Sequence, residues 1–150
     1  MLEVGSFEGR SAIWTLQNIL TDDQSTITCI DIWNRSEIEK RFDSNILKTD
    51  QSNKVIKIKS ASYKALRQLP LFQYDFIYID GSHEGYNVLE DAVLCFRLLK
   101  QNGILIFDDY LWEGKATIYP KPAIDAFLQM YQRHIKVLHC DWQIICQKHK

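Results

Sequence analysis

The second half of the sequence holds a histidine and three aspartates whose spacing could form a reactive site. Asp80 and His83 lie three residues apart in YIDGSHEGY, and Asp108 and Asp109 are adjacent in FDDY. A histidine can accept a proton at neutral pH, which makes His83 a candidate general base. The alternative is a surface residue beside a helix N-terminus, but the other polar strand ends nearby favour a function.

The three aspartates could also hold a metal ion. Carboxylates that meet without a counter-charge repel one another. A divalent cation with oxygen ligands, such as magnesium, would relieve this repulsion at Asp80, Asp108 and Asp109. The alternative is that one acid caps a helix and another pairs with a lysine. The residues alone leave the metal-bound and the metal-free interpretation open.

A second group, EVGSFEGRS at positions 3–11, predicts a turn that could approach a ligand. Gly5 and Gly9 let the backbone bend tightly, and the helix that follows offers free N–H groups. The spacing matches neither the dinucleotide fingerprint G-x-G-x-x-G nor the phosphate loop G-x-x-x-x-G-K-[ST]. Glu3 would repel a phosphate but could meet a cationic or hydroxyl-bearing ligand. By itself the turn is equally consistent with a plain structural role.

Asp31 ends the β-branched run TITCID, close to the spacing of roughly 20 residues after the glycines that a ribose-binding acid shows. An acid there can accept hydrogen bonds from both hydroxyls of a ribose. A helix cap or a loop acid is the alternative, and for this residue alone it is the more common one. Trp33 either covers the face of an adenine or fills a gap in the core.

These residues must be positioned by alternating strands and helices. Apolar runs predict strands at 2–5, 26–31, 54–58, 75–80 and 104–108, and helical periodicity predicts helices at 10–20, 63–69, 85–100 and 122–134. Two closing strands, 135–140 and 142–147, form an antiparallel edge pair. This order predicts an α/β fold with a doubly wound, mostly parallel sheet and a ligand at the carboxyl ends of its strands. The loop 111–120 is a candidate lid.

Composition narrows the class of protein. The 150 residues suit a single domain of ordinary globular composition, with 46% hydrophobic and 25% charged residues. A net charge of −1 predicts neither a nucleic-acid nor a membrane partner. The N-terminal residues have no signal-peptide pattern, which predicts a cytoplasmic protein. The four cysteines form no CxxC pair, so buried thiols are favoured over a disulfide framework or a zinc site.

Together, EVGSFEGRS, IDIW and DFIYIDGSHEGYNVLEDAVLCFRLLKQNGILIFDDY resemble the class I S-adenosylmethionine-dependent methyltransferases. Within that class they look most similar to the small O-methyltransferase branch that includes macrolide-sugar and cephalosporin tailoring enzymes. The resemblance runs from residue 1 to about residue 148 and implies a Rossmann-like, seven-stranded methyltransferase fold. Residues 1–150 would form a single domain with a truncated first strand and without the usual N-terminal helices.

The resemblance also implies roles by position. The glycine turn would receive the methionine end of the cofactor, the acid its ribose, and their neighbours its adenine: Glu3, Gly5, Ser6, Gly9, Asp31, Ile32, Trp33, Ser60, Ala61 and Asp80. His83, as general base, and Asp80 would be catalytic. Asp80, Asp108 and Asp109 match the positions that hold magnesium in metal-dependent members. The implied reaction is methylation of a small-molecule hydroxyl.

Two departures from the family pattern bear on this expectation. Relatives often carry an acid at the position of Ala61, where it contacts the adenine amino group. They also carry helices before the first strand; without a replacement, an apolar face would lie bare and favour a homodimer or poor solubility. Both departures favour the rival reading, a degenerate methyltransferase-like domain that binds a cofactor or a protein without catalysis. A nicotinamide-dependent dehydrogenase is a weaker rival because the glycine spacing is wrong.

Overall fold

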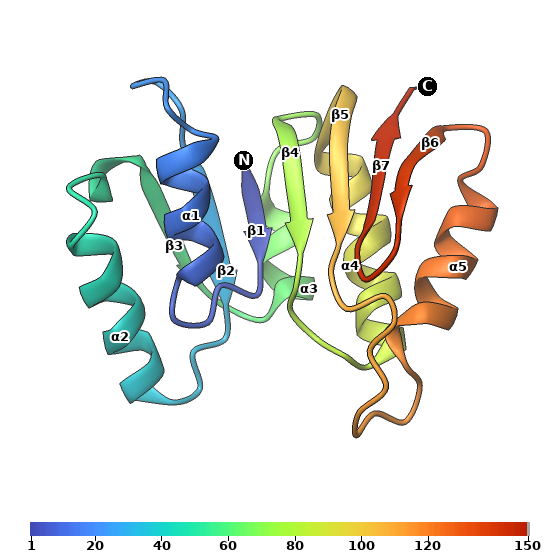
Figure 1. Ribbon diagram of the computed structural model, residues 1–150, viewed down its shortest axis with the longest axis horizontal. Helices are drawn as coiled ribbons and strands as arrows, with labels where there is room; N and C mark the ends of the chain where they lie inside the picture. Colours follow the sequence, from blue (N-terminus) through green and yellow to red (C-terminus); the bar gives the residue numbers. More distant parts are fainter. Residues whose placement is uncertain (150) are drawn as a thin grey trace.

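Seven strands form one sheet in the order β3-β2-β1-β4-β5-β7-β6 (Figure 1). The computed structural model describes residues 1–149. The strands are β1 (Leu2–Val4), β2 (Ile27–Asp31), β3 (Val55–Lys59), β4 (Tyr74–Ile79), β5 (Leu99–Phe107), β6 (Ile135–Cys140) and β7 (Ile144–Lys148). Strands β1 to β5 pair in parallel, whereas β7 pairs antiparallel with β5 and β6. The predicted sheet and its antiparallel edge pair are confirmed.

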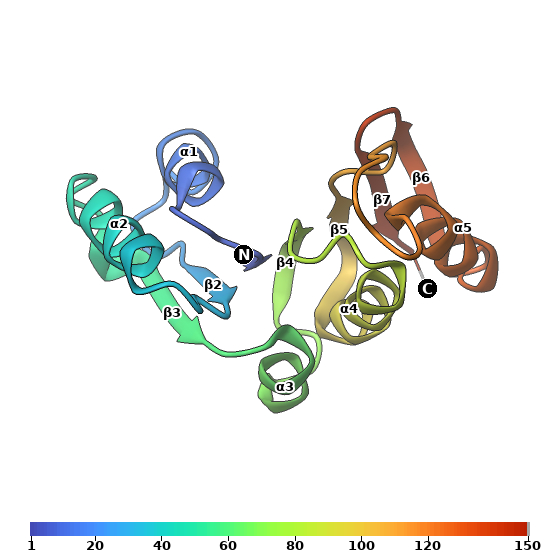
Figure 2. The ribbon, with the colours of Figure 1, turned by 90° about the horizontal axis from the view of Figure 1, so that it is seen from below.

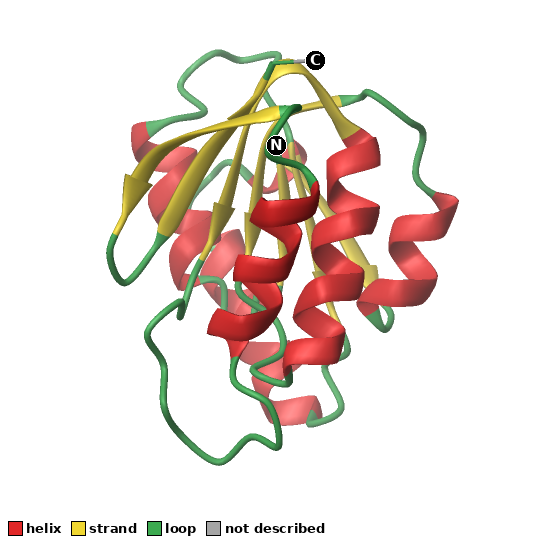
Figure 3. Cartoon of the chain, turned by 90° about the vertical axis from the view of Figure 1, so that its right-hand side faces the viewer, coloured by secondary structure: helices red, strands yellow, loops and turns green. Residues whose placement is uncertain are grey.

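Helices cover both faces of the sheet, as expected for a doubly wound fold (Figures 2 and 3). They are α1 (Arg10–Asn18), α2 (Ser36–Leu47), α3 (Ser62–Ala65), α4 (Gly85–Leu98) and α5 (Pro120–Met130), with short 3-10 turns η1 (Ser52–Lys54) and η2 (Leu66–Gln68). Helices α1 and α2 lie on one face, and α3, α4 and α5 lie on the other.

Each face of the sheet buries its own apolar cluster. On the α4 side, Phe107 of β5 packs edge-on against Phe127 of α5, with ring centroids 5.5 Å apart. On the α1 side, Leu16 and Phe42 pack with Trp33, and all three are almost fully buried. These two clusters pack the helices against the two faces of the sheet and so position the strand ends.

The parallel register brings the carboxyl ends of β1, β2 and β4 to one edge of the sheet. Val4 is level with Ile30 of β2 and with Ile79 of β4. Beyond these pairs, the Gly5 N–H donates to the Ile30 carbonyl and the Asp80 N–H donates to the Val4 carbonyl, both at 2.8 Å. The polar residues that follow the three strands are therefore neighbours.

The structure adds a helix, α2, that the apolar pattern did not predict. Its buried residues Ile38, Phe42 and Ile46 recur every four positions in an otherwise charged segment. This stripe is a helical signal, but it is narrow, and it is buried where α2 packs beside α1, β2 and Trp33.

Several predicted boundaries move as well. Residues 63–69 form α3 followed by the 3-10 turn η2 rather than one helix. Helix α4 ends at Leu98 rather than at Lys100, because β5 already begins at Leu99. The Asn102-Gly103 pair therefore lies within β5 and does not stop the helix; Asn102 has a positive φ of 64° there.

One part of the sheet has no helical cover in the described chain. On the α1 side, no helix of residues 1–149 lies over β4 and β5 (Figure 2). Phe76, Tyr78 and Ile106 are partly exposed there, and Trp14 of α1 is exposed beside them. The bare apolar face expected from the sequence is present. Within the same residues, no helix combines the length and apolar character needed to cross a membrane.

Candidate functional site

Two cavities at the carboxyl ends of the strands meet at Gly5, Phe7 and Asp80. The first, called the Asp31 cavity, has a volume of about 610 Å³ and lies between the ends of β1 to β4 and the start of α4. The second, called the Trp14 cavity, has a volume of about 800 Å³ and lies between α1 and the bare face of β4 and β5. A ligand in one cavity would therefore border on the other.

The Asp31 cavity gathers most of the residues that the sequence singled out: Gly5, Asp31, Ile32, Ser60, Ala61, Asp80 and His83. Ser6 and Asp108 line the Trp14 cavity instead. Four predicted residues line neither cavity: Glu3, Gly9, Trp33 and Asp109. The predicted site is therefore largely assembled, but not every member faces the same space.

The turn after β1 depends on glycine at Gly5. Its φ is +89°, a left-handed conformation that other residues adopt only at a cost. A Cβ atom at this position would lie 2.0 Å from the Asp80 carbonyl oxygen. The absent side chain thus lets β1 and β4 end in direct contact, which places the turn next to Asp80.

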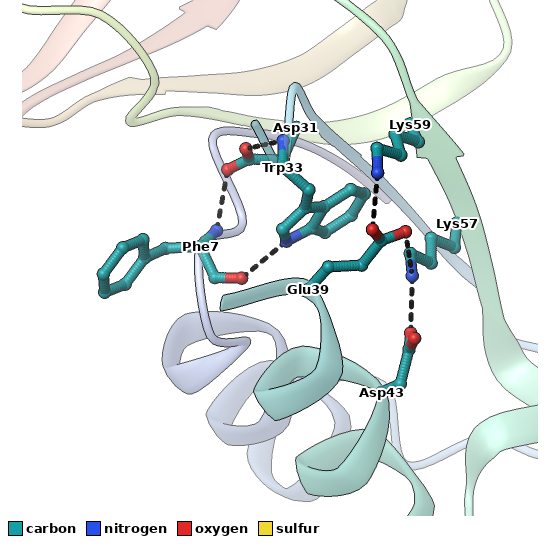
Figure 4. A network of polar contacts seen from close by, with 7 residues as sticks. All are labelled: Phe7, Asp31, Trp33, Glu39, Asp43, Lys57 and Lys59. Atoms are coloured by element: carbon teal, nitrogen blue, oxygen red, sulfur yellow. Dashed lines mark hydrogen bonds and ion pairs between the residues drawn. The ribbon is translucent and has the colours of Figure 1, made fainter. Parts of the chain in front are cut away.

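Asp31 holds the glycine turn and the next loop together (Figure 4). Its Oδ2 accepts the Phe7 N–H at 2.8 Å, and its Oδ1 accepts the Trp33 N–H at 2.9 Å. Each carboxylate oxygen has further lone pairs that can accept a hydroxyl from a ligand. Asp31 is thus held in place by the backbone and still lines the cavity.

Of the two roles that the sequence left open for Trp33, the structure favours the gap in the core over a cover for an adenine. The ring is 2% exposed and packs against Phe42, with centroids 4.7 Å apart. Its Nε1–H donates to the Phe7 carbonyl at 2.8 Å, and the Lys57 ammonium lies 4.9 Å from its centroid. Trp33 therefore fills a gap in the core, because the loop after β2 turns its side chain toward α2 (Figure 4).

Negative charge accumulates where the two cavities meet. Burial, followed by the carboxylates of Asp108, Asp109 and Glu3, raises the pKa of Asp80 to about 7. Burial also raises the pKa of Glu3, whose Oε2 accepts the Ser6 hydroxyl at 2.6 Å while Oε1 lacks a partner among residues 1–149. Within residues 1–149, no lysine or arginine forms a salt bridge with any of these four acids, Glu3, Asp80, Asp108 and Asp109. The site therefore favours a cationic ligand.

His83 is oriented by two neighbours. Its Nε2 lies 2.6 Å from Oδ2 of Asp109, and its ring lies over Trp112, with centroids 4.4 Å apart. A proton on Nε2 satisfies Asp109 and leaves Nδ1 free to accept another. The pair is therefore arranged as a base and the carboxylate that orients it.

The predicted metal ligands are not gathered as a ready metal centre. Within residues 1–149, no group of three or more histidine, cysteine, aspartate or glutamate side chains could hold a metal ion. Asp108 already accepts the Tyr78 hydroxyl, the Gln143 amide and the Asp109 N–H, and Asp109 accepts from His83. Both carboxylates are therefore engaged with other partners in this arrangement, and magnesium binding stays a prediction.

Some residues of the Asp31 cavity escaped the sequence analysis. Ser82, Asn87 and Asp91 line it from the first half of α4 and the loop before it. Asn87 donates to the Ser82 hydroxyl at 3.0 Å, which ties the loop to the helix. Polar residues near the start of the helix after β4 are the signal that could have identified them, because that helix begins at the carboxyl end of the sheet.

The sequence is similar to a known protein family and to a plant protein. A family model described as a methyltransferase domain matches residues 2–110. A protein of Arabidopsis thaliana that bears a caffeoyl-CoA O-methyltransferase name is 33% identical over 116 residues, which are 75% of this chain and 47% of that protein. The chain therefore spans about half the length of this relative.

The fold is similar to solved structures of O-methyltransferases. An O-methyltransferase from Bacillus cereus, solved with SAH, aligns with a TM-score of 0.79 at 17% identity. The alignment covers 99% of this chain and 73% of the Bacillus cereus chain. The O-methyltransferase TomG of Streptomyces achromogenes, solved with SAM, aligns with a TM-score of 0.76 at 12% identity, covering 99% and 72%. At identities this low, the structural likeness shows a shared fold and nothing further.

Proposed function

We propose that this chain, which belongs to the methyltransferase-domain family, transfers the methyl group of S-adenosylmethionine to a hydroxyl oxygen of a small molecule. The match over residues 2–110 shows the family membership. The carboxylates without a counter-charge at the junction of the two cavities support S-adenosylmethionine as the cofactor. The fold shared with SAM- and SAH-bound O-methyltransferases supports the reaction class.

The charge of the junction suits this cofactor. S-adenosylmethionine combines a sulfonium cation and an ammonium group with a ribose and an adenine. Asp80, in contact with the Gly5 turn, would attract the cationic part, because opposite charges lower the cost of burying each other. Asp31 would accept the ribose hydroxyls, and the turn at residues 60–62 would border the adenine. Every part of the molecule then has a complementary wall.

The chemistry asks little of the leaving group. The acceptor oxygen attacks the methyl carbon, the carbon–sulfur bond breaks, and its electron pair stays on sulfur as a neutral thioether. The protein must hold oxygen, carbon and sulfur in line and must remove the hydroxyl proton. His83 would take that proton on Nδ1, with Asp109 stabilising the imidazolium that forms. These reaction steps balance in atoms and charge without a metal ion.

The loop between β5 and α5 is the best candidate for the acceptor wall. Trp112 in this loop packs on His83, and Tyr119 packs edge-on against Trp112, with centroids 6.3 Å apart. The Glu84 carboxylate accepts the Thr117 N–H at 3.1 Å, which ties the loop to the start of α4. Aromatic rings beside the base suit an acceptor with an apolar ring. A homodimer through the bare face of β4 and β5 and a cytoplasmic location stay predictions.

The proposal predicts micromolar binding of SAH, the demethylated cofactor, measured by calorimetry. Asp31→Asn should weaken SAH binding about tenfold or more, because a neutral amide replaces one charge-assisted acceptor. NAD serves as the comparison ligand. Binding of NAD in place of SAH would support a dehydrogenase, and binding of neither would support the interaction domain; either result contradicts the proposal.

His83→Ala should lower turnover by about 10²- to 10⁴-fold in an assay with a hydroxyl acceptor. The Kd for SAH should stay unchanged, because the base acts on the acceptor and not on the cofactor. A matched control is His134→Ala, since His134 lies at the far end of the sheet between α5 and β6. Equal losses of turnover and cofactor affinity would refute the base assignment. Loss of activity on chelation would show that a metal, and not His83 alone, activates the acceptor.

A further inference from the structure

Asp91 is a buried acid on the wall of the Asp31 cavity that the reaction described above does not use. It lies on α4 with 2% of its surface exposed. Ser60, Ala61 and Ser62, which form the turn after β3, line the cavity beside it. Burying a charge is costly unless it meets a partner, so a buried acid at a cavity wall indicates a ligand.

No cation neutralises Asp91 within the described chain. Residues 1–149 contain no salt bridge to it. Burial, followed by the nearby Glu90 carboxylate, raises its pKa to about 6, and the Ser62 hydroxyl opposes this rise. Asp91 is therefore mostly ionised at neutral pH and can only accept hydrogen bonds. The ligand group that suits it is a donor.

The turn after β3 links Asp91 to the ribose end of the cavity. Lys59 is level with Asp31 in the β2–β3 register, and the Ser60 N–H donates to the Asp31 carbonyl at 2.9 Å. The cavity thus extends from Asp31, past the turn, to Asp91. A base attached to a ribose at Asp31 would have Asp91 at the far end of its pocket.

We propose that the Asp91 carboxylate accepts a hydrogen bond from the exocyclic amino group of the cofactor's adenine. This inference rests on the proposed function, since it presumes a cofactor with a nucleoside in the Asp31 cavity. Ala61 offers the turn only a methyl group, so the acid comes from α4 instead. The amino group of adenine is a donor, whereas the carbonyl oxygen of hypoxanthine in the same place would present a second acceptor. Asp91 therefore selects adenine over hypoxanthine.

Calorimetry with two ligands tests this selection. The ligands are SAH and S-inosylhomocysteine, which carries oxygen in place of the amino group. The unmodified protein should bind SAH about 10- to 100-fold more tightly, because the oxo analogue leaves the buried carboxylate unpaired. Asp91→Asn should weaken SAH binding about tenfold and leave the analogue's binding equal or tighter, because an amide can donate to the oxo group. Discrimination between the two ligands should therefore disappear.

Glu90→Gln is the matched control. Glu90 is the neighbouring acid on α4, but its side chain is 38% exposed and pairs with Arg67 at 2.6 Å outside the cavity. This variant should keep both affinities, and thermal unfolding should show that both variants are folded. If Asp91→Asn weakens SAH and the analogue by the same factor, the inference is overturned while the proposed function stands. If the unmodified protein binds neither ligand, the proposed function fails, and the inference fails with it.

Discussion

Replacing Gly5 with alanine should abolish SAH binding and lower the free energy of unfolding by about 3–5 kcal/mol. The Cβ atom would lie 2.0 Å from the Asp80 carbonyl oxygen and 2.5 Å from its carbonyl carbon. These are backbone atoms, so no side-chain rotation can make room. The φ of +89° adds a conformational penalty for any residue other than glycine. Chemical denaturation and calorimetry measure the two effects.

Gly81→Ala is the control for this prediction. Gly81 directly follows Asp80, yet a Cβ atom there would meet only ordinary contacts, the closest being Val4 Cγ1 at 3.4 Å. We expect it to change the free energy of unfolding by less than about 1 kcal/mol. If both variants lose the same stability, the close approach of β1 and β4 does not explain the need for glycine at Gly5.

Asp80→Asn should stabilise the ligand-free protein at pH 8 while abolishing turnover. The pKa of Asp80 is about 7 in the folded state, raised from 3.8. A raised carboxyl pKa means that the unmodified protein loses stability as the pH rises from about 4 to above 7, because the folded state must then release a proton that it holds strongly. At about 1.4 kcal/mol per pKa unit, the gain on substitution is about 2–4 kcal/mol at pH 8.

The pH dependence distinguishes this effect from a general change in packing. The gain from Asp80→Asn should shrink as the pH falls below 7 and approach its low-pH plateau near pH 4, measured by denaturation at several pH values. Asp75→Asn is the control, since Asp75 stands near the opposite end of β4 with its side chain 78% exposed in a salt bridge to Lys100. If the gain in the free energy of unfolding is the same at pH 5 and pH 8, the folded protein does not disfavour the ionised form of Asp80.

These two variants indicate how the site is built. Gly5 lets two strand ends touch, and Asp80 brings an uncompensated charge to the point of contact. A protein that holds an acid with so high a pKa gives up stability to keep it. A cationic ligand at this junction would recover part of that energy, since it favours the charged form of Asp80. SAH, which has lost the sulfonium charge, should therefore bind less tightly than S-adenosylmethionine.

The sequence by itself determined the strand order along the chain and the residues at the strand ends. Apolar runs such as DFIYID and ILIFD mark buried parallel strands, and each ends in an acid. Their clustering follows from a general rule, since parallel strands present their carboxyl ends at one edge. For that reason the sequence alone could predict that Gly5, Asp31, Asp80 and His83 lie close together. In the structure all four line one cavity.

The tertiary structure alone decided which way each side chain faces and what lies opposite it. Trp33 turns into the core because the loop after β2 meets α2, a helix whose narrow apolar stripe gave little local signal. Asp109 pairs with His83 and Asp91 joins the cavity across long distances in sequence. Such contacts depend on packing between segments that no local pattern relates. Strand ends are therefore readable from sequence, whereas the partners of each polar group depend on the assembled fold.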